Sequence, residues 1–323
     1  MSQPVERKPS YSIIVPVYNN AQSLSSLLES LVEIDKKVSE EYSADVTFIF
    51  VIDGSPDESA QVLEAILSRN IIKAKILYHS RNFGSFAAIR TGLGAQETDY
   101  YGMIAADLQE PPELLISFFN KMHVEGSEVV VATRSARDDP FMSKLFSNAF
   151  WKIYKKFVVK NIPAGGVDLF GCSLKVRNEL LLLKEANSSL VAQLFWLGHE
   201  FATIDYSRQK REHGKSGWSF SKKLKYMMDS VFSFTDLPIK FISFTGALAM
   251  FVALVYGIIL IVTRLLGYIP PTGFAALMIV ILFMGGLNAF AIGVLGNYAW
   301  RTFENSKARP LSLISSEKTF RKK

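Results

Sequence analysis

Apolar and polar positions alternate along the first 134 residues in a pattern of buried strands separated by helices. Between the strands, leucine, isoleucine and phenylalanine recur at helical spacing, as in residues 22–41 and after Pro111 and Pro112. This alternation predicts an α/β fold with a mostly parallel sheet covered on both faces. Five apolar runs predict the strands: residues 11–17, 46–52, 76–79, 100–106 and 129–133.

Beyond residue 134 the pattern is less regular until the chain becomes strongly apolar. Aromatic residues on one side predict a helix at 142–160, and residues 201–206 are a candidate added strand. Residues 219–236 place apolar side chains opposite a cluster of lysines, which is typical of a helix lying at a membrane surface. An ordinary surface helix is the alternative.

Two segments near the C-terminus, at about 241–263 and 274–296, contain no charged residue. Each has about 22 residues, enough to cross a hydrocarbon core ~30 Å thick, and two in succession favour a transmembrane hairpin over buried core helices. Lysine and arginine are frequent on both outer flanks, so the positive-inside rule predicts that both ends are cytoplasmic. Gly285, Ala289 and Gly293 predict close helix packing, within the hairpin or between the subunits of a homo-oligomer.

Composition agrees with a soluble domain joined to a membrane part. Hydrophobic residues make up 49% of the 323 residues and are concentrated near the C-terminus. The net charge of +6 is compatible with nucleic acid, an anionic membrane or a phosphorylated substrate, but no nucleic-acid-binding motif is present. A single cysteine, Cys172, excludes an intrachain disulfide and fits a reducing compartment. The N-terminus lacks the apolar stretch of a secretory signal.

Polar residues follow each of the first four predicted strands. Ligands of open parallel α/β sheets bind outside the carboxyl ends of the strands, so four polar segments at one edge predict a site there. Asp53 could accept hydrogen bonds from a ribose or base, or cap a turn. Asp107 and Gln109 offer oxygen ligands to a divalent cation and would point the same way in an extended chain; a helix cap is the alternative for Asp107. The segments are residues 16–20, 53–55, 80–84 and 107–112.

Several other chemistries lack their motifs. There is no phosphate-binding P-loop, no dinucleotide-binding glycine pattern after a strand, and no serine-hydrolase elbow. The four histidines show no metal-ligand spacing and are interpreted as structural or surface residues. A basic cluster from Arg208 to Trp218, with Arg134 and Lys144 upstream, is suited to binding phosphate, either of a substrate or of lipid headgroups.

These segments together resemble the GT-A glycosyltransferases of family 2, and more narrowly the polyprenyl-phosphate glycosyltransferases, which include dolichyl-phosphate mannose synthases and bacterial undecaprenyl-phosphate sugar transferases. The resemblance runs from about residue 11 to 311. The matching motifs are Val15-Pro16-Val17-Tyr18-Asn19, Asp53-Gly54-Ser55 with Asp57, Arg81-Asn82-Phe83-Gly84, Asp107-Leu108-Gln109 with Pro111-Pro112-Glu113, Arg208…Arg211…Gly214-Lys215-Ser216, and residues 293–298 leading to Ala308-Arg309-Pro310.

The resemblance implies a GT-A domain followed by a two-helix transmembrane hairpin. It implies inverting transfer of a sugar from a UDP- or GDP-linked donor to a polyprenyl phosphate at a membrane, in the service of a cell-envelope polysaccharide, with Mg²⁺ or Mn²⁺ as cofactor and no nucleic-acid partner. Asp107 is the implied catalytic residue, and Asp107 and Gln109 are the implied metal ligands. The implied donor-binding residues are Pro16, Val17, Tyr18, Asn19, Asp53, Arg81, Asn82, Gly84 and Asp107. The implied acceptor-phosphate residues are Arg134, Lys144, Ser147, Arg208, Arg211 and Lys215.

Two positions depart from the family pattern. Ile52 stands where relatives carry the first aspartate of Asp-Asp-Gly-Ser, and Ala105 stands where they carry the first aspartate of Asp-x-Asp. The alternatives are transfer to another lipid-linked glycan and a non-catalytic scaffold that kept the fold. A processive polymerase is not favoured, because the Gln-x-x-Arg-Trp motif is missing.

The resulting organisation has five parts in a multi-pass protein of the cell (inner) membrane, with the catalytic domain and both termini in the cytoplasm. They are a disordered N-terminus (1–9), a GT-A catalytic domain (10–218), an amphipathic interfacial helix (219–240), two transmembrane helices (241–300) and a basic cytoplasmic tail (301–323).

Overall fold

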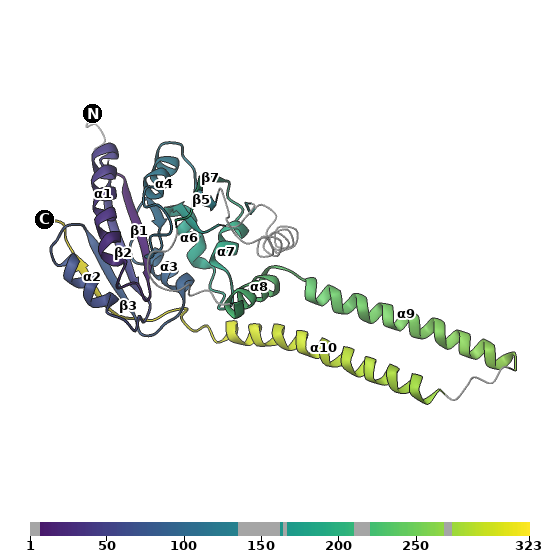
Figure 1. Ribbon diagram of the computed structural model, residues 1–323. Helices are drawn as coiled ribbons and strands as arrows, with labels where there is room; N and C mark the ends of the chain where they lie inside the picture. The colour runs from purple at the N-terminus through teal and green to yellow at the C-terminus, as the bar shows by residue number, and fades with distance from the viewer. Residues whose placement is uncertain (1–6, 135–161, 164–166, 210–219, 268–272) are drawn as a thin grey trace. The chain divides into compact units, whose positions relative to one another are not determined.

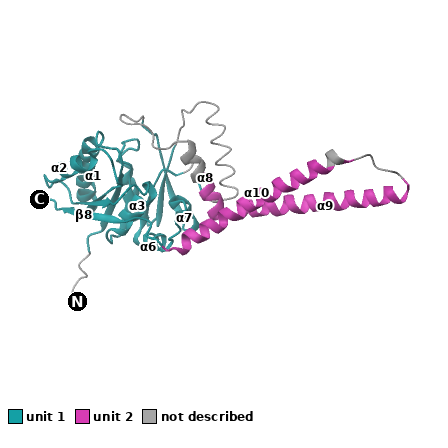
Figure 2. Cartoon of the chain, turned by 90° about the horizontal axis from the view of Figure 1, so that it is seen from below, with its two compact units in different colours: residues 1–223, 309–323 teal, residues 224–308 magenta. Residues whose placement is uncertain are grey.

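The computed structural model describes residues 7–134, 162–163, 167–209, 220–267 and 273–323. The chain forms two compact units, one of residues 1–223 with 309–323 and one of residues 224–308 (Figure 2). The predicted helix at 142–160 and the first six residues of the predicted disordered N-terminus lie outside the described residues.

The first unit is built on one mixed, mostly parallel sheet (Figure 1). Its strands run in the order β7-β5-β6-β4-β1-β2-β3-β8, and antiparallel pairing is confined to β6 and β8. The strands are β1 (Ser10–Val17), β2 (Asp45–Ile52), β3 (Ala74–His79), β4 (Tyr100–Met103), β5 (Val129–Arg134), β6 (Leu169–Ser173), β7 (Phe201–Tyr206) and β8 (Ile314–Phe320).

Helices cover both faces of this sheet, as the continuous apolar strands require. The hydroxyl of Tyr11 on β1 donates to Leu115 of α4, while a Cβ on Gly92 of α3 would meet Ile14 at 2.4 Å. Because Tyr11 and Ile14 point to opposite faces of β1, α4 and α3 lie on opposite sides of the sheet. The helices are α1 (Leu24–Tyr42), α2 (Ser59–Leu67), α3 (Ser85–Gly94), α4 (Leu114–His123), α6 (Leu174–Leu182) and α7 (Leu190–Trp196).

The five strands predicted from apolar runs and the added strand at 201–206 are confirmed. The prediction that the fourth strand continues to Ala106 is wrong, because β4 ends at Met103 and the chain turns soon after. Strands β6 and β8 were not predicted. Residues 301–323, expected as a basic tail, contain the end of a helix and then β8, which pairs with β3.

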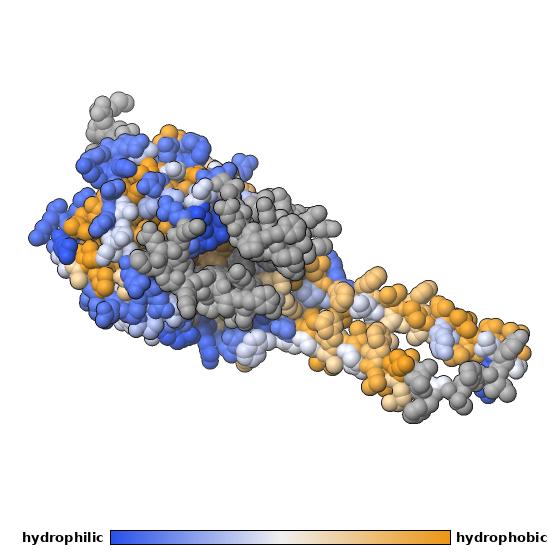
Figure 3. All heavy atoms as spheres, viewed as in Figure 1, coloured by the Kyte–Doolittle hydropathy of each residue, from blue (hydrophilic) through white to orange (hydrophobic). Residues whose placement is uncertain are grey.

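The second unit contains α8 (Phe220–Phe234) from Leu224 onward, together with α9 (Leu237–Leu265) and α10 (Phe274–Ser306). The helices α9 and α10 are long and apolar enough to cross a membrane, and their apolar windows are 0% buried (Figure 3). So large an exposed apolar surface indicates membrane association.

Polar contacts within this unit join α8 to the last turns of α10. Arg301 of α10 donates to Asp229 at 2.6 Å, and its guanidinium lies over the ring of Phe232 at 5.3 Å. The Tyr298 hydroxyl donates to the carbonyl of Thr235 at 3.3 Å. In contrast, added Cβ atoms on Gly285 and Gly293 would meet nothing within 4 Å among the described residues, so the small-residue face does not pack within the hairpin.

Candidate active site

The register of the parallel strands aligns their carboxyl ends at one edge of the sheet. Val17 at the end of β1 lies opposite Ile52 of β2, and Ile52 lies opposite Tyr78 of β3. On the other side of β1, Ile14 pairs with Met103 of β4. The four polar segments predicted from the sequence therefore emerge beside one another, as the parallel arrangement requires.

Asp53, directly after β2, holds the loop that follows β3. Its carboxylate is 2% exposed and accepts hydrogen bonds from His79 Nδ1, the Phe83 amide and the Gly84 amide, each at 2.8 Å. Burial acts to raise the pKa of Asp53, but the bonds from His79 and the two amides outweigh it, so the pKa is lowered. The carboxylate is thus charged and fully engaged with protein groups.

Gly54 allows this loop to approach the end of β2. It has a φ of +60°, and a Cβ at this position would lie 2.5 Å from backbone atoms of both Arg81 and Asn82. A side chain cannot be accommodated without moving the loop, so the glycine is required by both conformation and space.

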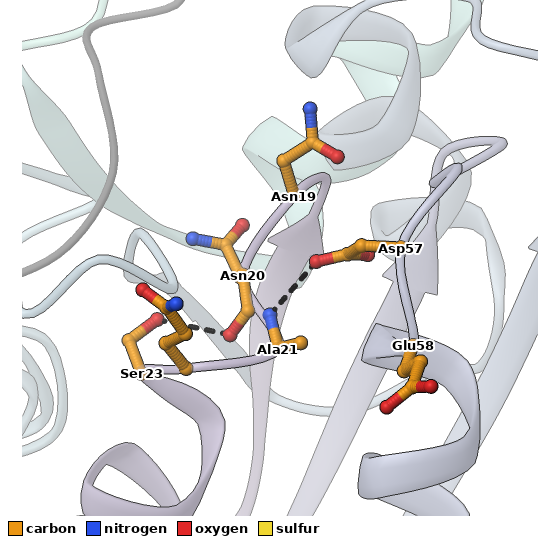
Figure 4. A pocket seen from close by; sticks show the side chains of 7 residues that line it. Asn19, Asn20, Ala21, Ser23, Asp57 and Glu58 are labelled. Carbon is orange, nitrogen blue, oxygen red and sulfur yellow. Dashed lines mark hydrogen bonds between the residues drawn. The ribbon is translucent and has the colours of Figure 1, made fainter.

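The loops after β1 and β2 are joined by short hydrogen bonds. Asp57 accepts from the Ser55 hydroxyl at 2.5 Å and from the Ala21 amide at 3.0 Å, and Ser55 in turn accepts from the Asn19 amide at 2.8 Å. Asn19 has a positive φ of 55°. The sequence predicts that Asn19 lies at the end of the strand, but not that these hydrogen bonds join the two loops. A pocket of about 460 Å³ lies between the two loops (Figure 4). Its lining residues are Asn19, Asn20, Ala21, Gln22, Ser23, Asp57 and Glu58.

The loop after β3 presents two exposed polar side chains, Arg81 and Asn82, on a braced backbone. The guanidinium of Arg81 lies 4.1 Å from the centroid of the Phe83 ring, which itself packs edge-on against His79. Arg81 also donates to the carbonyl of Asn82 at 3.2 Å, and among the described residues it pairs with no carboxylate, so its charge remains available at the surface.

The loop after β4 is a turn rather than an extended segment. Leu108 has a φ of +56°, so the expected alternation of Asp107 and Gln109 along an extended chain is wrong. The two residues nevertheless stay together, because the amide of Gln109 donates to Asp107 Oδ1 at 3.3 Å. Both side chains are half-buried.

Arg208 and Gln209 are hydrogen-bonded to this turn from the segment after β7. The guanidinium of Arg208 donates to Gln109 Oε1 at 2.5 Å and lies 3.5 Å from Glu110 Oε1. The amide of Gln209 donates to the carbonyl of Gln109 at 2.9 Å. The sequence placed Arg208 in a basic cluster, and the structure brings it to the predicted metal ligands.

Glu110 is a buried carboxyl beside this contact. It is 3% exposed, and among the described residues its Oε2 atom has no hydrogen-bond partner. Burial raises its pKa to about 7, the negative charge of Asp107 adds to that rise, and Arg208 opposes it. A buried carboxyl oxygen without a partner is rare in proteins and marks a place suited to a cation or a proton.

Arg134, at the end of β5, is already paired. It donates to Asp168 from Nε at 2.5 Å and from Nη2 at 2.7 Å, and the Tyr206 hydroxyl also donates to Asp168, at 2.8 Å. The predicted acceptor-site residues Lys144, Ser147, Arg211 and Lys215 lie outside the described residues.

Comparison with known proteins identifies the family of the chain. Residues 12–174, half of the chain, match the model of glycosyl transferase family 2. The chain belongs to glycosyl transferase family 2. The predicted family, the GT-A fold class and the assignment as a glycosyltransferase are therefore confirmed.

Similar family 2 proteins extend over nearly the whole length. An uncharacterised glycosyltransferase of Synechocystis is 32% identical over 94% of each chain, and a putative glycosyltransferase of Bacillus subtilis is 32% identical over 94% of this chain and 90% of that one. The bactoprenol glucosyl transferase of Shigella phage SfV is 28% identical over 95% and 98%. Among solved structures, mannosyl-3-phosphoglycerate synthase from Rubrobacter xylanophilus has a TM-score of 0.46 and is 14% identical over 69% of this chain and 72% of that one.

The turn after β4 has the chemistry to hold a divalent cation in this family 2 enzyme. Asp107, Gln109 and the orphaned Oε2 of Glu110 are all oxygen donors, as Mg²⁺ and Mn²⁺ prefer. Within the part of the chain that the structure describes, no group of three or more His, Cys, Asp or Glu forms a complete site. The residues therefore fit a cation that shares its coordination with substrate phosphates.

Several polar residues of the candidate site had no role predicted from the sequence. Glu110 lies in the predicted polar segment 107–112, but its burial has no signal in the sequence. Asp168 had no local signal, because its partners Arg134 and Tyr206 are 34 and 38 residues away in the chain. His79 was interpreted as structural, and its burial against Asp53 agrees with that interpretation.

Proposed function

We propose that this glycosyltransferase moves a sugar from a UDP- or GDP-linked donor to a polyprenyl phosphate at the cytoplasmic face of the cell membrane, with inversion at the anomeric carbon. The observation that carries the proposal is that one family 2 chain has both four polar strand-end loops, aligned at one edge of the sheet, and two exposed apolar helices. Relatives over nearly the full length are named bactoprenol glucosyl transferases, and bactoprenol is a polyprenol.

The donor lies across the loops after β1, β2 and β3. The exposed Asn19, Arg81 and Asn82 meet the nucleotide and its diphosphate directly, with Tyr18 beside them and Pro16 and Val17 at the strand end. Asp53 and Gly84 support the donor indirectly. The Asp53 carboxylate accepts a hydrogen bond from the Gly84 amide and so fixes the backbone against which the donor binds. A site held in this way needs little reorganisation when the ligand arrives.

Asp107 and Gln109 would hold a divalent cation, Mg²⁺ or Mn²⁺, next to the donor diphosphate. A bound cation would neutralise the negative charge that develops on the departing nucleotide diphosphate. Asp107 is the catalytic residue in this account, since it meets the group that leaves.

The acceptor phosphate approaches from the side of β5 and β7. An oxygen of the lipid phosphate attacks the anomeric carbon, the bond from that carbon to the diphosphate oxygen breaks, and the nucleotide diphosphate leaves with the electron pair. A phosphate monoester has its second pKa at about 6 and is already largely ionised at neutral pH, so no strong general base is needed. Arg208 binds this phosphate, with Lys144, Ser147, Arg211 and Lys215 as further candidates. Arg134 contributes less directly, because Asp168 holds its guanidinium.

The orientation in the membrane is supported by the topology of the sheet. The chain enters α9 after the sheet domain, and the segment after α10 returns to pair with β3 as β8. Both flanks of the apolar helices therefore belong to one folded domain and stay on the same side of a membrane, which requires an even number of crossings. The basic flanks, which include Lys307 and Arg309, make that side the cytoplasm.

A homo-oligomer is part of the proposal. Gly285, Ala289 and Gly293 are exposed on α10, and a Cβ added at either glycine would meet nothing within 4 Å among the described residues. Small residues at this spacing let a second helix approach closely, and a second copy of α10 provides one.

The test is sugar transfer by the detergent-purified protein. A panel of labelled UDP- and GDP-sugars is offered with undecaprenyl phosphate, with and without EDTA. A labelled lipid that forms with one donor and disappears with EDTA supports the proposal and names the donor. Turnover of a donor with no labelled lipid contradicts the proposed acceptor, and transfer that survives EDTA contradicts the role of the cation.

A further inference from the structure

A continuous chain of hydrogen bonds, buried at its first link and partly buried beyond it, runs from the donor edge into the C-terminal segment. Asp53 bonds to His79 Nδ1 at 2.8 Å, His79 Nε2 bonds to the Thr91 hydroxyl at 2.8 Å, and Thr91 bonds to the Ser312 hydroxyl at 2.7 Å. The His79 side chain is 0% exposed. Four residues, from the loop after β2, from β3, from α3 and from the C-terminal segment, are therefore linked through one imidazole.

The hydrogen bonds at Asp53 fix the first link of this chain. The ionised Asp53 accepts from two backbone amides and from His79, so the imidazole carries a hydrogen on Nδ1. The Thr91 hydroxyl bonds to Nε2 on the other side of the ring, and the Ser312 hydroxyl bonds to Thr91. Removal of the Thr91 hydroxyl leaves Nε2 without this partner, whereas removal of the Ser312 hydroxyl takes away the group that orients Thr91.

The C-terminal strap, residues 309–323, is tied to the end of β3 beside this chain. The Ser80 amide donates to the carbonyl of Leu313 at 2.9 Å, and the Ser315 hydroxyl donates to the carbonyl of Tyr78 at 3.1 Å. The register between β3 and β8 shifts between Tyr78 and His79, so the strap leaves regular pairing where His79 turns inward. Ser312 reaches Thr91 from this irregular stretch.

The other end of the chain of bonds sets the conformation of the loop after β3. Asp53 holds the amides of Phe83 and Gly84, and the Phe83 ring packs edge-on against His79 with centroids 5.3 Å apart. Rotation of the imidazole would disturb both the carboxylate and the aromatic contact. The loop that presents Arg81 and Asn82 therefore depends on the orientation of His79.

We propose that His79 is a positioning residue for the donor-binding loop and that Ser312 of the C-terminal strap, acting through Thr91, completes it. The segment that follows the second apolar helix is then a functional part of the donor site rather than a tail. This inference rests on the proposed donor role of residues 81–84. It assigns no chemistry to His79, whose buried ring is in contact with protein groups on both nitrogens.

The experiment compares Thr91→Val and Ser312→Ala with the matched control Ser315→Ala, which removes a hydroxyl from the same strap outside the chain of bonds. Amide hydrogen exchange is followed in peptides that contain Phe83 and Gly84, and steady-state kinetics are measured with the donor varied. Exchange is expected to quicken about fivefold to tenfold in both test variants, the loss of about one hydrogen bond. The KM for the donor is expected to rise by a similar factor while kcat changes less than about twofold.

Thr91→Ser keeps the hydroxyl and loses the methyl group, so both values should stay near those of the wild-type protein, whereas a role of Thr91 in packing alone would make this variant defective. Test variants that match Ser315→Ala in exchange and in KM overturn the proposal. So does a fall in kcat with no change in donor KM, and so does exchange that quickens across the whole sheet. If the wild-type protein transfers no sugar from any donor, the proposed function fails instead, and the exchange result still decides whether Thr91 and Ser312 order the loop.

Discussion

The two halves of the strand-end edge hold their polar groups in different ways. After β1, β2 and β3, Asp53 and Asp57 accept from backbone amides, hydroxyls and one histidine. After β4, charged and amide groups face one another instead: Arg208 contacts Gln109 and Glu110, and among the described residues Glu110 Oε2 has no hydrogen-bond partner. The first half is complete without a ligand, whereas the second has groups whose present partners a ligand can replace.

This difference separates the part of the edge suited to binding the donor from the part suited to catalysis. A nucleotide-sugar binds best to a rigid surface, because the loops of such a surface are already ordered in the folded protein and their ordering does not weaken binding. A cation and a second substrate must enter and leave, and they need groups that exchange partners at low cost. We expect the first half to respond to substitution through stability and donor affinity, and the second through turnover and acceptor affinity.

The largest effect is expected from Gly54→Ala in the first half. The new Cβ would lie 2.5 Å from backbone atoms of Arg81 and Asn82 at a φ of +60°. We expect a loss of more than about 2 kcal/mol of stability, read as a lower Tm, together with weaker donor binding. Gly94→Ala is the control, since a Cβ there meets nothing within 4 Å among the described residues. Equal Tm values for the two variants would show that the loop does not pack on β2 as described.

Asp53→Asn should cost roughly 1–3 kcal/mol at pH 7, because its amide group would oppose the Gly84 amide. The pKa of Asp53 is lowered in the folded protein, so its contribution is present above the unfolded pKa of about 4 and is lost as the pH falls through the folded value. The Tm difference between variant and wild type should therefore narrow from pH 7 toward pH 3. A difference that stays constant with pH would contradict the charged, hydrogen-bonded state of Asp53.

Arg208→Gln probes the second half. We expect kcat/KM for the lipid acceptor to fall about tenfold, the loss of one charge-assisted contact to phosphate, while the KM for the donor changes less than about twofold. Steady-state kinetics with each substrate varied in turn provide the measurement. A raised KM for the donor with an unchanged kcat/KM for the acceptor would show that Arg208 binds the donor instead.

The smallest effect is expected from Lys318→Ala on β8. Lys318 Nζ lies 2.6 Å from Glu64 Oε2, but the lysine side chain is 52% exposed. Exposed ion pairs contribute little, so the loss should stay below about 1 kcal/mol and kinetics should not change. A large loss of activity in this variant would mean that the surface of β8, and not the Ser312 contact alone, supports the donor site.

The strands and polar loops of the first half could be predicted from the sequence, because the pattern that indicates them lies within each segment. The apolar runs that form β1, β2 and β3 are continuous, so their parallel order and their polar ends could be inferred before any coordinates. The strand β8 could not, because Ile314–Phe320 is a polar edge strand that is exposed along nearly its whole length and shows no apolar alternation.

Contacts between distant segments could not be predicted from the sequence either. The sequence predicts that Asp53 and Asp107 lie at one edge, but not that the Asp53 carboxylate accepts hydrogen bonds from His79 and two backbone amides. It predicts a basic cluster around Arg208 but not its contact with Gln109, 99 residues away. Residue type and spacing identify which groups meet, and only packing determines which of them are already paired.

The most direct test of the central claim is a single-turnover assay of sugar transfer from the identified donor to undecaprenyl phosphate by wild-type protein, Asp107→Asn and the remote control Lys318→Ala. We expect equal Tm values for Asp107→Asn and wild type, full transfer by the control, and at least about a hundredfold slower transfer by Asp107→Asn. Transfer by folded Asp107→Asn at the wild-type rate would contradict the claim that the sugar leaves its nucleotide at this edge of the sheet.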